Sequence, residues 1–292
     1  MPKFTIIDAP SILGLRPTGV EFLPEALKSA GIIEGLNADY TGLVPSLPYN
    51  KERDKTTLLL NPYSIRTFSL QLADVVSSVL RRGQFLIVLG GDCSILLGNL
   101  LALRRVGRYG LFFIDGHADF YQPDVSLTGE VADMELAIAS GRGPDVLANI
   151  DGLKPLVRDE DIILFGYRDT EQAVSYGSQD VRNTKMHIFD FAYVNEFGIM
   201  GTAPQAIKLL LKDRLDGFWI HLDADVLDNS IMPAVDYRLD GGLSFSELSE
   251  LLKIIITSGR AVGIDITIFN PNLDLDGSIA RNFVSSIVEG LT

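Results

Sequence analysis

The stretch Leu111-Phe112-Phe113-Ile114-Asp115-Gly116-His117-Ala118-Asp119 joins an apolar run to three side chains of the kinds that bind metal ions. The apolar run predicts a buried strand. Because side chains alternate along a strand, Asp115 and His117 point the same way, and Asp119 lies just past the strand end. Two carboxylates and an imidazole in so small a volume indicate either a cation between them or a turn with solvated acids and a hydrogen-bonded histidine.

Apolar runs alternate with amphipathic segments along the whole chain. Strands are predicted at residues 4–8, 85–89, 111–114, 161–166, 186–190, 217–223 and 261–268, with a short one inside 37–48. Helices are predicted at residues 21–30, 62–82, 95–106, 130–140, 204–213, 244–258 and 278–289, and Ser244 with Glu247 forms a capping box. This alternation predicts a three-layer α/β/α fold with a mainly parallel sheet. No linker or repeat interrupts it, so we expect residues 1–292 to form a single α/β domain.

A second polar cluster has the same form as the first. The apolar run Phe218-Trp219-Ile220 leads into His221, Asp223 and Asp225, which share a face at strand spacing. In a parallel sheet both clusters lie at the carboxyl ends of strands, where such folds bind ligands. The four aspartates would then repel one another, and two divalent cations that share bridging carboxylates would relieve that repulsion. The sequence therefore predicts a metal centre.

The composition excludes several classes of protein. Hydrophobic residues make up 47% and charged residues 22% of the 292, which allows a sizeable core and argues against disorder. The formal net charge of −13 disfavours binding to nucleic acid or to an anionic membrane surface. No apolar stretch approaches the ~20 residues that span a bilayer, and residues 1–8 lack the pattern of a signal peptide. The one cysteine, Cys93, cannot form an internal disulfide, so we expect a cytoplasmic protein.

Three motifs give the sequence a family likeness. They are Gly90-Gly91-Asp92-Cys93-Ser94, Asp115-Gly116-His117-Ala118-Asp119 and Asp223-Ala224-Asp225-Val226-Leu227-Asp228. Shorter matches are Gly19-Val20-Glu21 with Pro24, Gly166-Tyr167-Arg168-Asp169, and Asn270-Pro271. In their order and separation these segments resemble the arginase/agmatinase/formiminoglutamase (ureohydrolase) family over nearly the whole chain.

The resemblance implies a centre of two divalent metal ions, usually manganese in this family. The implied ligands of one ion are Asp115, His117, Asp223 and Asp225, and those of the other are Cys93, Asp115, Asp119 and Asp223. In this arrangement Asp115 and Asp223 bridge the two ions.

The resemblance also implies a mechanism. A hydroxide that bridges the metals, held in addition by Asp119, would attack an amidino carbon, and the tetrahedral intermediate would release an amine. His221, a further candidate catalytic residue, would contact a metal ligand and so orient it, without binding the metal itself. Family members act on small molecules, form trimers or hexamers, and are mostly cytoplasmic.

Cys93 departs from the family pattern, because it stands where the family has a metal-ligating histidine. A thiolate at this position favours zinc, iron or nickel over manganese. Alternatively, Cys93 is a small buried residue without metal contact. The metal that the centre prefers depends on which of the two is correct.

Three other positions bear on the substrate. Glu130 is the nearest match to the family's proton-shuttling histidine, and it is either a buried acid/base or an exposed residue in the first turn of a helix. Ile268 stands where guanidino-acting members carry a glutamate that pairs with the guanidinium. An apolar residue cannot anchor a cation, so a different amidine, a formimino group or an amide suits the site better than arginine or agmatine. Glu171 is either a substrate-binding residue, as in some arginases, or a solvated side chain.

The sequence thus predicts a binuclear-metal-dependent hydrolase of a non-peptide C–N bond of amidino, guanidino or formimino type. Three alternatives stay open. The first is a catalytically silent relative that keeps metal binding, and the second is an amidohydrolase or deacetylase-like activity on a non-guanidinium substrate. The third is a nucleotide- or sugar-binding protein with one Mg²⁺, although the glycine-rich loops that hold phosphates are missing.

Overall fold

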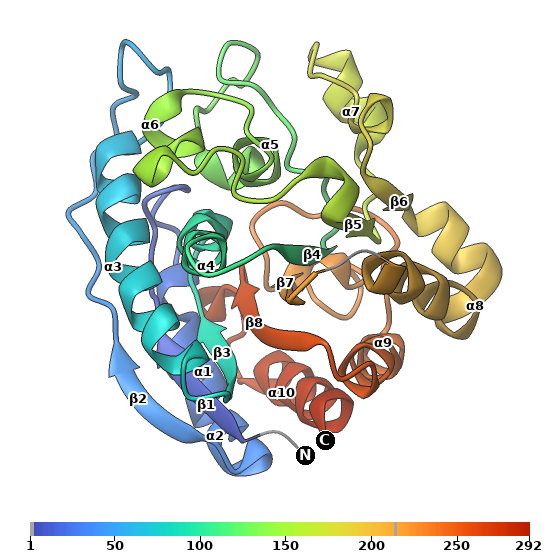
Figure 1. Cartoon of the computed structure of the whole chain (residues 1–292). Coiled ribbons are helices and arrows are strands. Elements are labelled where there is room, and N and C mark those ends of the chain that lie inside the picture. Colours follow the sequence, from blue (N-terminus) through green and yellow to red (C-terminus); the bar gives the residue numbers. More distant parts are fainter. Residues whose placement is uncertain (1–2, 213–214) are drawn as a thin grey trace.

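A parallel sheet runs through the middle of the molecule, as Figure 1 shows for the computed structural model, which describes residues 3–212 and 215–292. Within these residues eight strands pair in the order β2-β1-β3-β8-β7-β4-β5-β6, and every neighbouring pair is parallel. The strands are β1 (Phe4–Asp8), β2 (Asp39–Leu43), β3 (Phe85–Leu89), β4 (Tyr109–Ile114), β5 (Ile162–Phe165), β6 (His187–Phe189), β7 (Gly217–Asp223) and β8 (Ala261–Thr267). The predicted α/β class with a parallel sheet is confirmed.

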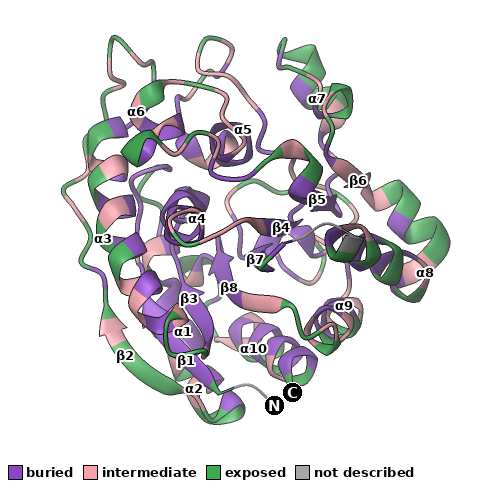
Figure 2. Ribbon diagram, viewed as in Figure 1, coloured by how far each residue is buried: buried purple, intermediate pink, exposed green. Residues whose placement is uncertain are grey.

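Helices cover both faces of the sheet. They are α1 (Leu23–Ser29), α2 (Ile32–Leu36), α3 (Pro62–Leu80), α4 (Leu96–Arg104), α5 (Glu135–Ala139), α6 (Asp145–Ala148), α7 (Thr170–Ser175), α8 (Phe191–Lys212), α9 (Phe245–Thr257) and α10 (Ser278–Leu291). On β3, Ile87 and Leu89 pack in the core with α9 and α10, whereas Leu86 and Val88 pack in the core with α3 and α4. Figure 2 shows the central strands buried on both sides, which explains their uninterrupted apolar sequences. None of the described helices combines the length and apolarity needed to cross a bilayer.

Two predicted helices differ from the structure. Residues 130–140 form a 3-10 turn at Val131–Asp133 and then α5, because Met134 breaks the helix with φ −137°. The helix predicted at 204–213 is the second half of α8, which begins at Phe191 and bends at Gly198, where φ is 69°. Glycines at 198 and 201 lower helix propensity and hid the first half in the sequence. Asp213 lies outside the described residues.

The predicted capping box of α9 is confirmed. The Ser244 hydroxyl accepts a hydrogen bond from the backbone N–H of Glu247 at 3.2 Å, and the Glu247 carboxylate accepts one from the N–H of Ser244 at 2.8 Å. This reciprocal pair satisfies two amides at the helix start. It fixes where α9 begins and so how it packs on the sheet next to α10.

The pairing of β7 with β8 depends on a glycine. Trp219 on β7 lies opposite Gly263 on β8, and a Cβ added at Gly263 would collide with the Trp219 ring. Trp219 is fully buried, and its indole N–H donates to Asp265, also on β8. Gly263 therefore provides the space in which a large ring and a buried carboxylate meet.

We expect Gly263→Ala to lower the free energy of unfolding by about 1–3 kcal/mol, because overpacking forces the tryptophan or its strand to move. Urea unfolding measures the change. Gly201→Ala on α8 is the matched control, since its added Cβ meets only Phe197 Cβ, at 3.4 Å. That variant should keep or slightly raise stability. Equal effects of the two substitutions would contradict this account.

Candidate metal centre

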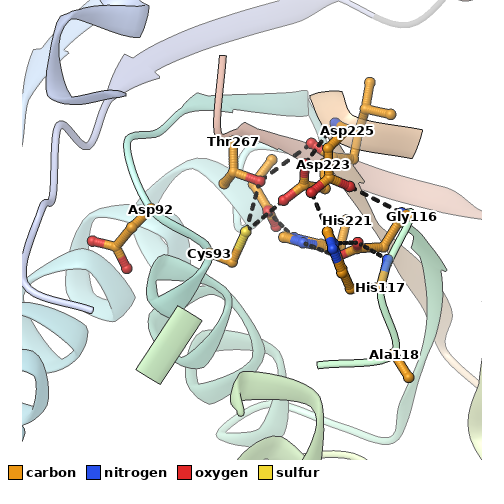
Figure 3. Close-up of polar contacts among 12 residues, drawn as sticks. Asp92, Cys93, Gly116, His117, Ala118, His221, Asp223, Asp225 and Thr267 are labelled. Atoms are coloured by element: carbon orange, nitrogen blue, oxygen red, sulfur yellow. Dashed lines mark hydrogen bonds and ion pairs between the residues drawn. The ribbon is translucent and has the colours of Figure 1, made fainter. Parts of the chain in front are cut away.

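The carboxyl ends of β4 and β7 meet the loop after β3 in a buried polar cluster (Figure 3). Order in the sheet brings this about, since β7 lies beside β4 and only β8 separates it from β3. The six predicted metal ligands all contribute to the groups of donor atoms in this cluster: Cys93, Asp115, His117, Asp119, Asp223 and Asp225. Their donor atoms lie within 4.8 Å of one another inside each group.

Backbone amides hold three of the carboxylates in place. One oxygen of Asp115 accepts from the N–H of His117 at 2.7 Å, and one oxygen of Asp223 accepts from the N–H of Asp225 at 2.7 Å. Asp225 in turn accepts from the N–H of Gly116 at 3.0 Å, which ties the two strand ends together. Asp115 Oδ2 is buried and, among the described residues, has no hydrogen-bond partner. A bound cation would satisfy that oxygen, so the site fits a metal.

The negative charges of the buried carboxylates in the cluster would also be neutralised by a bound cation. Burial, together with the neighbouring carboxylates, raises the pKa of Asp115, Asp119 and Asp223 well above the usual range. Burial acts to lower the pKa of His117, but the carboxylates around it, Asp225 foremost at 2.9 Å, raise it to about 9. Without a metal ion, protons must supply the missing positive charge. Carboxylate oxygens with an imidazole are a donor set that manganese, iron and zinc accept.

Cys93 lies inside the cluster and is almost fully buried. Its thiol donates to Asp223 Oδ2 at 2.9 Å, and its sulfur is 3.2 Å from Thr267 Oγ1 (Figure 3). Burial, followed by the charge of Asp223, raises the pKa of the thiol well above its usual value. Asp92 turns the other way, to the hydroxyl of Ser11 at 2.9 Å, so its loop gives only Cys93 to the cluster.

His221 lies beneath the cluster and is fully buried. Its ring stacks on Phe113 with centroids 4.5 Å apart, and its Nδ1 is 2.5 Å from Asp265 Oδ2. Asp265 also accepts from the amide of Asn99 at 3.0 Å and from the indole of Trp219. Sequence reasoning missed Asp265. The signal was a charged residue in the middle of the apolar strand Ala261–Thr267, where only a partnered carboxylate is tolerated.

Glu135 is a second residue that sequence reasoning missed. It begins α5 and is fully buried. Its carboxylate lies within 4.8 Å of donor atoms of Cys93 and Asp119 in one group, and within 4.8 Å of donor atoms of Asp115 and His221 in another. A single glutamate after Met134 carries no pattern that distinguishes it from a helix-start residue. Only the fold of the segment after β4 reveals its position.

Two residues beside the cluster have strained backbones. Asp119 has φ 43° and Ile268, a β-branched residue, has φ 69°. Positive φ is unfavourable for such residues and is held in place by surrounding structure. The N–H of Ile268 donates to the carbonyl of Gly91 at 2.9 Å, and a Cβ at Gly91 would collide with the Ser11 carbonyl. The strained turn after β8 is therefore locked against the loop after β3.

A cavity of about 260 Å³ opens above the cluster. Four predicted ligands line its floor: His117, Asp119, Asp223 and Asp225. Its walls are mainly apolar and aromatic, and they include Leu15, Tyr121, Val125, Leu127, Tyr176, Tyr237 and Ile268. A small molecule in this cavity would touch the donor cluster with one end and apolar side chains with the other.

Comparison with known proteins identifies the family. The family model described as "Arginase family" matches residues 3–291. The chain belongs to the arginase family. Members of this family are metal-dependent hydrolases, and this arginase-family protein is one of them. An arginase of Staphylococcus aureus (strain COL) is 29% identical over 290 residues, which cover 97% of this chain and 94% of that protein.

The structural comparison agrees. The native structure of arginase from Bacillus caldovelox aligns over 100% of this chain and 98% of its own, with 27% identity and a TM-score of 0.88. Proclavaminate amidino hydrolase from Streptomyces clavuligerus, at 17% identity and a TM-score of 0.70, shares the fold. Both an arginase and a proclavaminate amidino hydrolase therefore share the fold of this chain.

Glu130 in this arginase-family protein is buried, so the alternative of an exposed first-turn residue is wrong. Its carboxylate is 3.0 Å from Arg16 Nε and accepts a hydrogen bond from the Tyr237 hydroxyl at 2.7 Å. It lines the cavity. Glu171 is exposed on α7, and among the described residues its neighbour Gln172 lines the cavity instead.

We expect the metal-free protein to lose stability between about pH 4 and about pH 9. Burial and Glu130 raise the pKa of Asp133, at the cavity wall, from 3.8 to about 8, and the pKa of His117 rises from 6.5 to about 9. The folded state then holds more protons than the unfolded chain across this window, so the free energy of unfolding falls as pH rises. Urea unfolding in the presence of chelator measures the slope.

The control is the same series with saturating Mn²⁺, which replaces the protons in the cluster and should remove the part of the slope that comes from His117, while the part from Asp133, outside the cluster, remains. A metal-free protein whose stability rises with pH across this window would contradict the prediction.

Proposed function

We propose that this protein hydrolyses a non-peptide C–N bond of an amidino, guanidino or formimino compound at two divalent metal ions, with manganese the usual metal of its family. The observation that carries the proposal is the convergence of the β4 and β7 aspartates around an unpartnered oxygen of Asp115, beneath a cavity that Asp119, Asp223 and Asp225 line. Asp115 and Asp223 share one group of donor atoms with Asp225, and they are the residues that would hold both ions. Metal ions bound there would lower the pKa of a water molecule and polarise the carbon that it attacks.

Asp119 and Glu130 are the cavity residues that we assign to proton transfer. Asp119 lines the floor, and its strained backbone holds the carboxylate next to the other ligands. We assign it to orient the attacking water and accept its proton. Glu130, with Tyr237 and Arg16 against it, lies in the same cavity and would take over the proton that Asp119 accepts from the water and pass it to the leaving nitrogen. His221 does not line the cavity, so its role is to act on a metal ligand or on the metal.

The substrate that the cavity favours carries an apolar group. Ile268 lines the cavity where a guanidinium-binding glutamate would stand in guanidino-acting relatives, and an apolar side chain gives no anchor to a cation. Tyr121, Tyr176 and Tyr237 add aromatic surface. We therefore propose an amidine or formimino compound with an apolar or aromatic substituent rather than arginine or agmatine.

The assembly and location that we propose follow the family. Tyr193 and Phe197, four residues apart before the bend in α8, share one face of the helix and are 37% and 52% exposed, and Met200 just beyond the bend is 65% exposed. Such a face supports a homo-oligomer, which we propose to be a trimer or hexamer, in the cytoplasm. Sedimentation equilibrium tests the oligomeric state, and a monomer at micromolar concentration would contradict it.

Hydrolysis should depend on metal and on Asp119. We expect Mn²⁺-loaded protein to release an amine from benzamidine-like or formimino substrates, chelator to abolish the release, and Asp119→Asn to lower kcat at least ~100-fold. Colorimetric detection of the released amine or ammonia measures the rate. Asp124→Asn, on the exposed part of the same loop, is the matched control and should keep full activity.

A metal-loaded protein that turns over none of the amidine, guanidine, formimino or amide compounds in such a screen would contradict the proposed function. It would favour a metal-binding relative without catalysis.

Ile268→Glu should shift the substrate preference. A carboxylate at this position would pair with a guanidinium in the cavity, so we expect kcat/KM for agmatine or arginine to rise at least ~10-fold relative to the wild-type protein. Ile268→Gln, of the same size without the charge, is the control and should give no such rise. A wild-type protein that already hydrolyses arginine or agmatine as well as the Ile268→Glu variant would contradict the proposed preference.

A further inference from the structure

Three fully buried side chains below the cavity floor point unpartnered atoms at one another. Asp115 Oδ2, His221 Nε2 and both carboxylate oxygens of Glu135 have no hydrogen-bond partner among the described residues. One donor atom from each of the three lies within 4.8 Å of the other two, and His221 Nε2 is 3.9 Å from Asp115 Oδ2. An unpartnered polar atom in a dry interior is costly, and four that converge indicate an absent binding partner.

His221 is held with its free nitrogen toward this point. Its Nδ1 contacts Asp265 Oδ2, so Nδ1 carries the proton and Nε2 presents a lone pair. Asp265 is fixed in turn by Asn99 from α4 and Trp219 from β7. A carboxylate that orients a histidine in this way is the usual support of a metal-binding imidazole. A divalent cation would satisfy Nε2 and the carboxylate oxygens together.

The distance between two of the three donor atoms suits ligands of one metal ion. Ligand atoms about 2.0–2.2 Å from a metal lie at most about 4.4 Å from each other. The 3.9 Å between His221 Nε2 and Asp115 Oδ2 falls within this limit. One imidazole and two carboxylates form a donor set of the kind that binds manganese, iron or zinc.

Cys93 is a weaker candidate for a metal ligand than these three residues. Its sulfur already has partners, since the thiol donates to Asp223 and lies against Thr267.

We propose that Asp115, Glu135 and His221 hold the deeper of the two metal ions in this chain, with the Cys93 thiol beside the ion and hydrogen-bonded to Asp223. The proposal rests on the proposed function in requiring a binuclear centre. It goes beyond that function because it replaces the cysteine-containing ligand set with one that includes Glu135 and His221. Asp265 is then a positioning residue for His221.

Cobalt binding tests the assignment without relying on activity. Metal-free full-length protein is titrated with Co²⁺, the bound metal is counted by elemental analysis after dialysis, and the absorption spectrum is recorded. The wild-type protein should bind two Co²⁺ per chain and show no thiolate-to-cobalt charge-transfer band. Glu135→Gln and His221→Asn should each weaken one of the two sites at least ~10-fold, whereas Cys93→Ser should change neither by more than about threefold.

Matched controls carry the same substitutions elsewhere. Glu171→Gln on exposed α7 and His187→Asn on β6 should bind two Co²⁺ as the wild-type protein does. Circular dichroism and urea unfolding of the metal-free variants show which of them fold. If one ligand variant does not fold, the other variant and the wild-type spectrum still decide.

Either of two results would overturn this assignment alone. One is an intense charge-transfer band in the wild-type cobalt protein that Cys93→Ser removes. The other is wild-type affinity for two Co²⁺ in both Glu135→Gln and His221→Asn. A wild-type protein that binds neither Co²⁺ nor Mn²⁺ would instead overturn the proposed binuclear function, and this inference with it.

Discussion

The confinement of several carboxylates in a dry space at one edge of the sheet is the constraint on which the rest of the structure depends. Parallel strands deliver their carboxyl ends to the same edge, so the acids that follow β4 and β7 cannot avoid one another. Backbone amides satisfy one oxygen of Asp115, Asp223 and Asp225, and the remaining negative charge needs a cation or protons. The stability of the fold and the chemistry of the site therefore both depend on the positive charge that neutralises these carboxylates.

A second layer of interactions holds this cluster from beneath. Trp219 and Asn99 fix Asp265, and Asp265 fixes the ring of His221. These residues come from β7, α4 and β8, so the packing of the sheet against its helices sets the orientation of one imidazole. Gly263 belongs to the same arrangement because it makes room for the indole. Through these contacts the core of the protein is coupled to its polar site.

The sequence predicted this molecule unevenly, for physical reasons. Strand period and apolar runs were enough for the parallel sheet, and the residues after β4 and β7 were enough for the ligand cluster, because position along a strand determines which face a side chain takes. Glu135 escaped prediction because it reaches the cluster through the irregular segment between β4 and α5. Glu130 was ambiguous because a glutamate at a helix start is common in either environment, and only tertiary contacts with Arg16 and Tyr237 distinguish the two.

The turn at Ile268 has a consequence for how such a protein can change. Its left-handed backbone is kept by the hydrogen bond to Gly91 and by the tight approach of that glycine to Ser11, and none of these contacts involves the Ile268 side chain. The shape of the main chain at this point is thus independent of the residue that it displays to the cavity. A single codon can exchange an apolar surface for an acidic one without rebuilding the loop. Main-chain contacts hold the turn, so the side chain that lines the cavity can change while those contacts remain.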